Sequence, residues 1–229
     1  MEVKFVDQMG SDLSVVNAAR VSFDKVSEWD YTFSAEDPSL CGYTTLKLKS
    51  QDEKLISFLA RENHWTPFGH TSLSIHVKAP IFVARQLGKH QVGLVWNEIS
   101  RRYVDSSPEF YIPESWRKKN PDKKQGSYED EFVDLSADLD HIVDSIVNLC
   151  KTTYNSMLDL GVCAEQARMI LPQNMYTEWY WSGSLIAFAR VCNLRLKKDT
   201  QLETRIIAQQ ISDIAASCFP ISWQYLKKV

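Results

Sequence analysis

Apolar and polar residues alternate most regularly between residues 71 and 77. Leucine, isoleucine and valine fall on one side of this segment, while serine and histidine fall on the other. A period of two is typical of a strand with one buried face. Two further strands are predicted at residues 3–6 and 175–181.

Helical spacing describes most of the remaining chain. Leu55, Ile56 and Leu59 share one face of a helix expected at residues 51–62. Further helices are expected at residues 12–20 with Ser11 or Asp12 as the cap, then at 80–90, 128–159, 165–171, 184–194 and 201–219. Residues 24–45 and 108–126 have the composition of loops. Strands and helices without a regular βαβ alternation predict an α+β fold, with helices around a mainly antiparallel sheet in a single domain spanning residues 1–229.

The most unusual composition lies in residues 80–103. Ten polar or charged side chains, among them Arg85 and Lys89, are interleaved with apolar ones such as Leu94 and Trp96. The apolar residues favour burial, and an unpaired charge is costly to bury beside them. We therefore expect an anionic ligand with hydrogen-bonding groups here, such as a nucleotide or a phosphorylated cofactor.

Spacing brings several of these polar groups together. In a helix, Gln86 and His90 lie on one face. In an extended segment, Ser100 and Arg102 fall on the same side, which suits the binding of a phosphate. A basic helix face exposed to solvent is the alternative for the first part of the segment. The chain has no glycine-rich phosphate loop, so neither a P-loop nor a dinucleotide-binding fold is predicted.

Overall charge and composition narrow the range of partners. A net charge of −3 and a pI near 6.0 argue against binding to a nucleic-acid polymer. No apolar run is long enough to span a membrane and the first residues lack a signal core, so we expect a cytoplasmic protein without membrane association. The five cysteines form no CxxC pair and are expected to be reduced. His64, His70 and His76 have a spacing that matches no metal motif, so no metal site is expected.

Four sequence blocks resemble, in the same order, those of the flavin-dependent thymidylate synthase family. They are MGSDLSVVNAARVSFDK (9–25), NHWTPFGHTSLSIHVKAPIFVARQ (63–86), NEISRRY with SPEFYIP (97–113) and ARMILPQNMYTEWYWSGSLIAFARVCNLR (167–195). The family's signature is an RHR triplet, seven residues and a serine. Here the triplet Lys89-His90-Gln91 is followed by eight residues before Ser100. Lysine keeps the positive charge but loses the bidentate fork of arginine, and glutamine loses the charge.

The resemblance implies reductive methylation of dUMP to dTMP. Methylenetetrahydrofolate would supply the carbon, NADPH the electrons, and FAD would act between them in a homotetramer with shared sites. Arg195 is the implied catalytic residue, because a guanidinium beside the pyrimidine would stabilise developing negative charge. The implied dUMP contacts are Gln86, Lys89, Glu98, Ser100, Arg101, Arg102, Arg168 and Arg195. The implied FAD contacts are His64, Thr66, Lys89, His90, Gln91, Asn97, Glu98, Ser184 and Arg190.

The altered triplet leaves two alternatives open. A sister enzyme on the same scaffold could modify another pyrimidine nucleotide, such as dCMP, or could deliver a hydroxymethyl group. The chain could also be an inactive subunit that binds a nucleotide or serves in assembly. The presence of Ser100, Arg102, Arg168 and Arg195 together argues against an inactive subunit.

Overall fold

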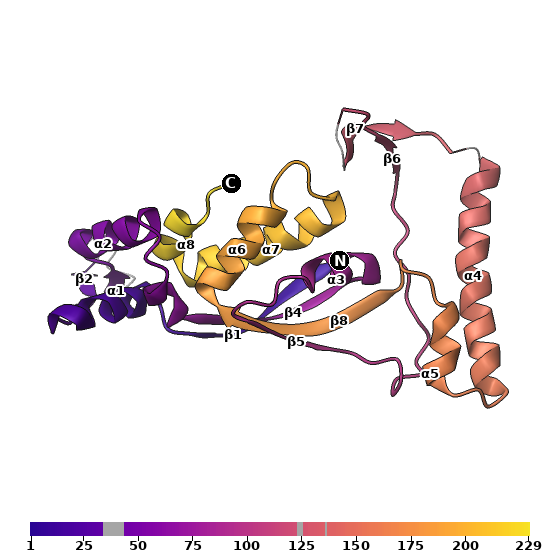
Figure 1. Cartoon of the computed structure of the whole chain (residues 1–229), viewed down its shortest axis with the longest axis horizontal. Helices are drawn as coiled ribbons and strands as arrows, with labels where there is room; N and C mark the ends of the chain where they lie inside the picture. The colour runs from indigo at the N-terminus through magenta and orange to yellow at the C-terminus, as the bar shows by residue number, and fades with distance from the viewer. Residues whose placement is uncertain (34–43, 123–125, 136) are drawn as a thin grey trace.

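A four-stranded antiparallel sheet forms the centre of the protein. The computed structural model describes residues 1–33, 44–122, 126–135 and 137–229. The strands lie in the order β1 (Glu2–Met9), β4 (Ser72–Pro80), β8 (Tyr176–Ser184) and β5 (Leu94–Glu98), and each neighbouring pair is antiparallel (Figure 1). Two hairpins lie outside this sheet: β2 (Asp30–Phe33) with β3 (Thr44–Lys47), and β6 (Trp116–Lys119) with β7 (Ser127–Val133).

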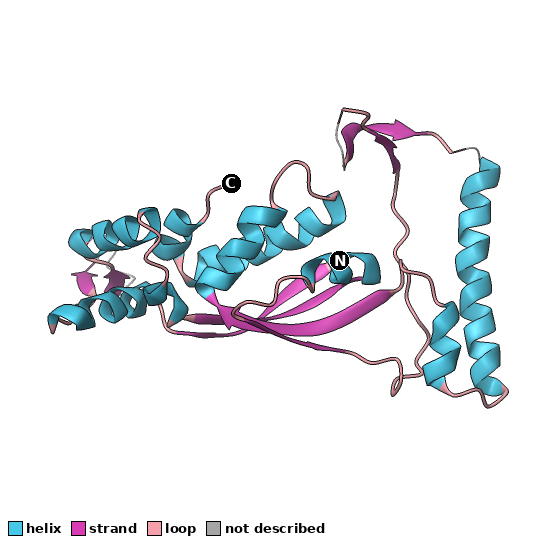
Figure 2. Cartoon of the chain, in the orientation of Figure 1, coloured by secondary structure: helices cyan, strands magenta, loops and turns pink. Residues whose placement is uncertain are grey.

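Helices cover one face of the sheet and stand at both of its ends (Figure 2). Helices α3 (Ile81–Leu87), α6 (Leu185–Arg195) and α7 (Leu202–Cys218) lie over that face. At one end are α1 (Asp12–Arg20), α2 (Ser50–Arg61) and α8 (Pro220–Leu226), and at the other are α4 (Ala137–Asp159) and α5 (Ala164–Ala167). Short 3₁₀ turns are η1 (Val21–Phe23), η3 (Thr66–Gly69) and η4 (Arg168–Ile170). The expected α+β class is confirmed. No helix in the described ranges is long and apolar enough to cross a membrane.

The buried face of the sheet forms the core together with these helices. Strand β4 alternates as expected, with its apolar residues at positions 73, 75 and 77 fully buried. Strand β8 adds Trp179 and Trp181, two of the largest fully buried side chains. Trp96 of β5 stacks on Trp179, with ring centroids 4.2 Å apart. Aromatic stacking of this kind adds to the apolar area that the rings bury, so it holds β5 against the sheet.

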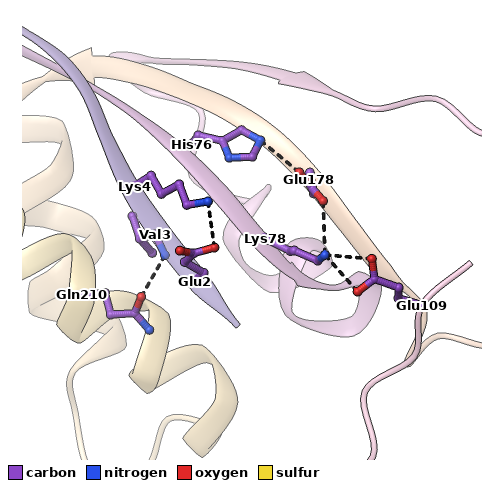
Figure 3. Close-up of polar contacts among 8 residues, drawn as sticks. All are labelled: Glu2, Val3, Lys4, His76, Lys78, Glu109, Glu178 and Gln210. Atoms are coloured by element: carbon purple, nitrogen blue, oxygen red, sulfur yellow. Dashed lines mark hydrogen bonds and ion pairs between the residues drawn. The ribbon is translucent and has the colours of Figure 1, made fainter.

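On the opposite face, β4 and β8 carry the charged or ionisable side chains His76, Lys78 and Glu178. Nε2 of His76 lies 3.3 Å from Oε2 of Glu178, and Nζ of Lys78 lies 2.9 and 3.0 Å from the two carboxylate oxygens of Glu109 (Figure 3). His76 is therefore an outward-facing strand residue with a carboxylate partner. Among the residues that the structure describes, no group of three or more His, Cys, Asp or Glu could hold a metal ion.

The β6–β7 hairpin overturns two expectations. The helix expected at residues 128–159 begins only at Ala137, because residues 127–133 form β7 and pair with β6. The loop expected at residues 108–126 contains β6. Three acidic residues suit a helix at 129–131, but Tyr128, Phe132 and Val133 favour a strand, and pairing with β6 decides the outcome. Residues 123–125 and 136 of these segments lie outside the described residues.

Three further differences occur at element boundaries. Helix α3 ends at Leu87 and not near His90, because Gly88 follows and glycine is unfavourable in a helix. The segment expected as a loop at residues 24–45 contains β2 and the start of β3, while residues 34–43 of that segment lie outside the described ranges. Helix α7 is followed by α8, which was not expected and which has Pro220 at its start, where proline is favourable.

Gly183→Ala should displace β5 and destabilise the protein. A Cβ at Gly183 would lie 2.2 Å from the carbonyl oxygen of Gly93 and 2.6 Å from Cδ2 of Leu94. Overpacking of this kind costs about 1–3 kcal/mol, which chemical denaturation would measure. Gly69→Ala is the matched control, because its Cβ would meet only the Trp65 ring, at 3.7 and 3.9 Å. Equal stability of the two variants would contradict the close approach of β8 to the start of β5.

Candidate functional site

Arg195 is the last residue of α6 and is held by two hydrogen bonds. Its Nε donates to Nε2 of His90 at 3.0 Å, and its Nη2 donates to the backbone carbonyl oxygen of Gln86 at 2.9 Å. Burial lowers the pKa of Arg195, although a guanidinium remains charged at neutral pH. No carboxylate in the described part of the chain pairs with it. Its charge is therefore available to a ligand.

The side-chain amide of Gln86 is fixed by the beginning of α7. Its Nε2 donates to Oε1 of Gln201 at 2.5 Å, and its Oε1 accepts from Oγ1 of Thr204 at 3.1 Å. Both ends of the amide have a partner, so the orientation of its donor and acceptor is set. The fold thus brings together three of the expected site residues, Gln86, His90 and Arg195, from α3, the turn after it and α6.

Gln86 and Arg195 line a polar hollow of about 570 Å³, here called the Arg195 hollow. Its volume is in the usual range for small-molecule sites. The other lining residues come from the β6–β7 hairpin, the end of α6 and the segment between α6 and α7: Arg117, Gly126, Ser127, Leu194, Lys197, Asp199, Thr200 and Gln201. Polar groups from three separate parts of the sequence therefore converge on one cavity.

A buried ion pair attaches the β6–β7 hairpin to α7 beside this hollow. Nη1 and Nη2 of Arg117 each lie 2.9 Å from a carboxylate oxygen of Glu203, and Nε of Arg117 donates to Oγ of Ser127 at 2.9 Å. Burial alone would raise the pKa of Glu203, but the hydrogen bonds and charge of Arg117 outweigh it and lower that pKa. Such bidentate pairs are geometrically specific. The pair therefore fixes the hairpin close to Gln201.

The triplet Lys89-His90-Gln91 lines a second hollow of about 520 Å³, here called the triplet hollow. Glu98 of β5 also lines it. The Glu98 carboxylate accepts from Oγ1 of Thr177 at 2.6 Å and from Nε1 of Trp96 at 3.1 Å. Because His90 lines the triplet hollow and also contacts Arg195, it lies between the two hollows.

Ser100, Arg101 and Arg102 form a turn after β5. Oγ of Ser100 lies 3.5 Å from Nε of Arg102, while the Arg101 side chain contacts the carbonyl oxygen of Ser106. The Arg102 guanidinium lies 5.0 Å from the ring centroid of Tyr103. Neither arginine is paired with a carboxylate of the described chain, and neither lines the Arg195 hollow. Both remain able to bind an anion.

The other expected site residues lie elsewhere on the chain. His64 and Thr66 line a third hollow of about 970 Å³ formed by α1, α2 and η3, here called the His64 hollow. Asn97 is exposed on β5, Arg168 is exposed in η4, Ser184 precedes α6 and Arg190 is exposed on α6. One chain therefore does not gather all the expected FAD and dUMP contacts in a single cavity.

Four polar residues of the site are not indicated by any sequence pattern: Arg117, Gln201, Glu203 and Thr204. Arg117 stands among lysines in a segment with the composition of a loop, and Glu203 is ordinary for the first turn of a helix. Their partners are far away in the sequence, so no local pattern distinguishes them. Only the packing of α7 against α3 and the hairpin reveals their role.

The cysteines offer no reactive group at these hollows. The four in the described ranges, Cys150, Cys163, Cys192 and Cys218, are free thiols, and Cys41 lies outside those ranges. Burial raises the pKa of Cys192 to about 12, which makes this thiol a poor nucleophile. None of the four lines the three hollows.

Arg117→Met should destabilise the protein by leaving Glu203 buried without its partner. Breaking a buried pair in this way costs roughly 3–5 kcal/mol, and the side-chain exposures of 16% and 5% place this pair in that class. Since the native pKa of Glu203 is lowered, the stabilisation is present above the ordinary carboxyl pKa of 4.5 and is lost as the pH falls through the lowered value. The loss of stability in Arg117→Met should therefore become smaller at acidic pH.

Chemical denaturation at neutral and acidic pH measures this effect. Lys118→Met is the matched control, because it removes the exposed Lys118–Glu131 pair from the same hairpin. It should leave the free energy of unfolding nearly unchanged, as is usual for a surface pair. An equal decrease in the free energy of unfolding of Arg117→Met and Lys118→Met would contradict the role given to Arg117.

Known proteins with similar sequences match almost the whole chain. The family described as "Thymidylate synthase complementing protein" (Thy1) matches residues 4–221. A flavin-dependent thymidylate synthase of Thermus thermophilus is 37% identical over 221 residues, covering 96% of this chain and 73% of that protein. That of Thermosipho africanus is 36% identical over 228 residues, covering 99% of this chain and 90% of that protein.

A solved structure agrees with the sequence matches. The UMP/dUMP methylase PolB from Streptomyces cacaoi, bound with 5-Br dUMP, has a TM-score of 0.74 at 28% identity, covering 98% of this chain and 93% of that one. The resemblance seen in the four sequence blocks is thereby confirmed. The chain belongs to the thymidylate synthase complementing protein family (Thy1), which it shares with flavin-dependent thymidylate synthases.

Proposed function

We propose that this protein converts dUMP to dTMP by reductive methylation at C5. In the balanced reaction, dUMP, methylenetetrahydrofolate, NADPH and a proton give dTMP, tetrahydrofolate and NADP⁺. The observation that carries the proposal is Arg195, a partly buried guanidinium held by His90 and Gln86 without a carboxylate partner in the described residues. The relatives from T. thermophilus and T. africanus are named for this activity, which supports the same assignment.

Arg195 would act at the pyrimidine edge as the catalytic residue. Bond formation at C5 is favoured when negative charge on N3 and the ring carbonyl oxygens is stabilised. Two N–H groups of Arg195 are used by His90 and Gln86, and the other three of its five remain for the nucleotide. A donor that is already oriented contributes roughly 3–4 kcal/mol to transition-state stabilisation. The proposal assigns no covalent nucleophile to the protein.

Other basic and polar groups would hold the phosphate and sugar. The proposed phosphate contacts are Lys89, Ser100, Arg101 and Arg102, which supply cationic or hydroxyl donors. Arg168 would join Arg195 at the pyrimidine edge. Gln86 keeps one amide hydrogen beyond its bond to Gln201. Glu98 would accept a hydrogen bond from a sugar hydroxyl, because a carboxylate cannot bind a phosphate directly.

The side chains around the triplet hollow fit a flavin nucleotide. Arg85 and Lys89 provide positive charge for a pyrophosphate, and His90, Gln91 and Glu98 provide neutral or acceptor groups. The other proposed contacts are His64, Thr66, Asn97, Ser184 and Arg190. When bound, FAD would supply the two-electron chemistry that these side chains lack. With Lys89 and Gln91 in place of arginines, the protein offers fewer bidentate donors to it.

Shared sites in a homotetramer would complete the binding surface. His64 and Thr66 line a different hollow from the triplet, and Arg168 does not line the Arg195 hollow. Helix α4 also leaves Ile142, Ile146 and Leu149 at least half exposed. Apolar side chains gathered on one helix suit burial against another protein surface. We therefore propose that other copies of this chain supply the separated contacts.

Methylation of UMP is the second candidate function. PolB of S. cacaoi, whose fold this chain shares, is described as a UMP/dUMP methylase. UMP and dUMP present the same pyrimidine to Arg195 and differ only in the 2′-hydroxyl group. We expect dUMP to be preferred, because relatives at 36–37% identity are thymidylate synthases.

Product identification by mass spectrometry tests this proposal. Purified protein would be incubated with FAD, NADPH, methylenetetrahydrofolate and an equimolar mixture of dUMP, UMP and dCMP. We expect dTMP. Methylated UMP would favour the second candidate, and a product from dCMP or a hydroxymethylated product would assign a sister activity. Nucleotide binding without any product would indicate an inactive subunit.

Arg195→Lys should impair catalysis strongly. Lysine keeps the charge but cannot bond His90, Gln86 and the pyrimidine in the planar geometry of arginine. We expect kcat for dTMP formation to fall roughly 10²- to 10³-fold, as for the loss of an oriented donor. Arg61→Lys, at an exposed residue paired with its neighbour Glu62, is the control and should retain normal activity. A normal kcat in Arg195→Lys would refute the assigned role.

A further inference from the structure

His90 lies between the triplet hollow and Arg195, and Arg195 lines the Arg195 hollow. His90 lines the triplet hollow, and its Nε2 accepts from Nε of Arg195 at 3.0 Å. Its backbone N–H donates to the carbonyl oxygen of Leu87 at 3.0 Å, so the turn that ends α3 sets the position of the ring. Any change at His90 is therefore transmitted to Arg195 through a direct contact.

The chemistry of this hydrogen bond determines the protonation state of His90. Nε of arginine always carries a hydrogen and cannot accept. Nε2 of His90 must then be the acceptor, which puts the only ring proton on Nδ1. An imidazolium has no acceptor nitrogen, so protonation would remove the bond and bring two cations together.

The charges around His90 favour the same neutral state. Arg195 approaches from α6, Arg85 and Lys89 line the same hollow from α3 and the turn after it, and Glu98 lines it from β5. The charged groups around His90 are thus three cations and one carboxylate. Burial, and then the charge of Arg195, lower the pKa of His90 below its ordinary value of 6.5.

We propose that His90 is a positioning residue whose neutral imidazole holds Arg195 in place for the nucleotide and whose protonation releases it. The backbone carbonyl of Gln86 is a second anchor that does not titrate, so protonation loosens the guanidinium without freeing it completely. The kinetic consequences rest on the function proposed above. The contact itself does not, because it exists without a nucleotide.

The proposal predicts a dependence on pH. Above the ordinary histidine pKa the imidazole is neutral and Arg195 is held. As the pH falls through the lowered pKa, His90 becomes charged and kcat/KM for dUMP should decrease by about tenfold, the usual effect of losing one hydrogen bond to a charged group. Below that pH, the KM for dUMP should rise as well, because the oriented donor also binds the substrate.

Nitrogen NMR of ¹⁵N-histidine-labelled protein tests the contact without nucleotide or turnover. We expect His90 to be the neutral Nδ1–H tautomer at neutral pH, with an apparent pKa below 6.5 that rises when Arg195 is replaced by methionine. The signal would be assigned by its loss in His90→Gln. An Nε2–H tautomer in the unmodified protein would overturn the proposal, and so would a His90 pKa that Arg195→Met leaves unchanged.

Two variants of His90 separate positioning from a merely structural role. His90→Gln can keep an acceptor oxygen near the place of Nε2 but cannot titrate, so its rate of dTMP formation should no longer fall as the pH is lowered through the His90 pKa. His90→Leu should be impaired at every pH. His76→Gln, on the open face of the sheet, is the matched control and should keep the original profile.

The outcomes distinguish the two proposals. A His90→Gln variant that keeps the original acidic limb would overturn the positioning role. If the unmodified protein forms no dTMP at any pH, the proposed function fails, and the tautomer and pKa of His90 measured by NMR still decide whether the contact exists.

Discussion

The pairing of β8 with strands on both of its sides is the constraint on which the site depends. β8 pairs with β4 from Tyr176 to Ser184, and β5 pairs with its other edge so that Glu98 lies opposite Trp179. Helix α6 starts immediately after β8 and ends at Arg195. The burial of Trp179 and Trp181 fixes β8 in the core. The same packing that stabilises the sheet therefore sets the positions of Arg195 and Glu98.

The arginines around the Arg195 hollow illustrate two uses of a partly buried charge. Arg117 is neutralised by Glu203, and the pair attaches a hairpin to α7. Arg195 is held instead by the His90 imidazole and a backbone carbonyl, which orient it without pairing it with a carboxylate. A charge in a partly desolvated cavity interacts more strongly than one in water. The first arrangement stabilises the fold, and the second leaves a positive charge that is available to a ligand.

Local patterns predicted the parts of the fold that depend on one segment. The alternation in β4 and the helical spacing of α2 were sufficient to predict these two elements, because each pattern follows from the burial of a single face. The hairpin at Ser127–Val133 could not be predicted, since its acidic residues also suit a helix and its pairing with β6 is a tertiary effect.

The residues of the candidate site also divide into those that the sequence indicates and those that only the packing reveals. Gln86, His90 and Arg195 were recognisable from motifs, and the fold brings them into contact across more than 100 residues of sequence. Their supports, Gln201 and Thr204, were not recognisable, because their meaning depends on α7 lying against α3. Residue types therefore suggested candidate site residues, while the orientation of these groups became visible only from the packing.

A crystal structure of the protein with FAD and 5-Br dUMP would test the central claim most directly. The account predicts that the pyrimidine edge contacts the free N–H groups of Arg195 while its bonds to His90 and the Gln86 carbonyl remain intact. A nucleotide bound away from Arg195, or an Arg195 that leaves both anchors to reach it, would contradict the account.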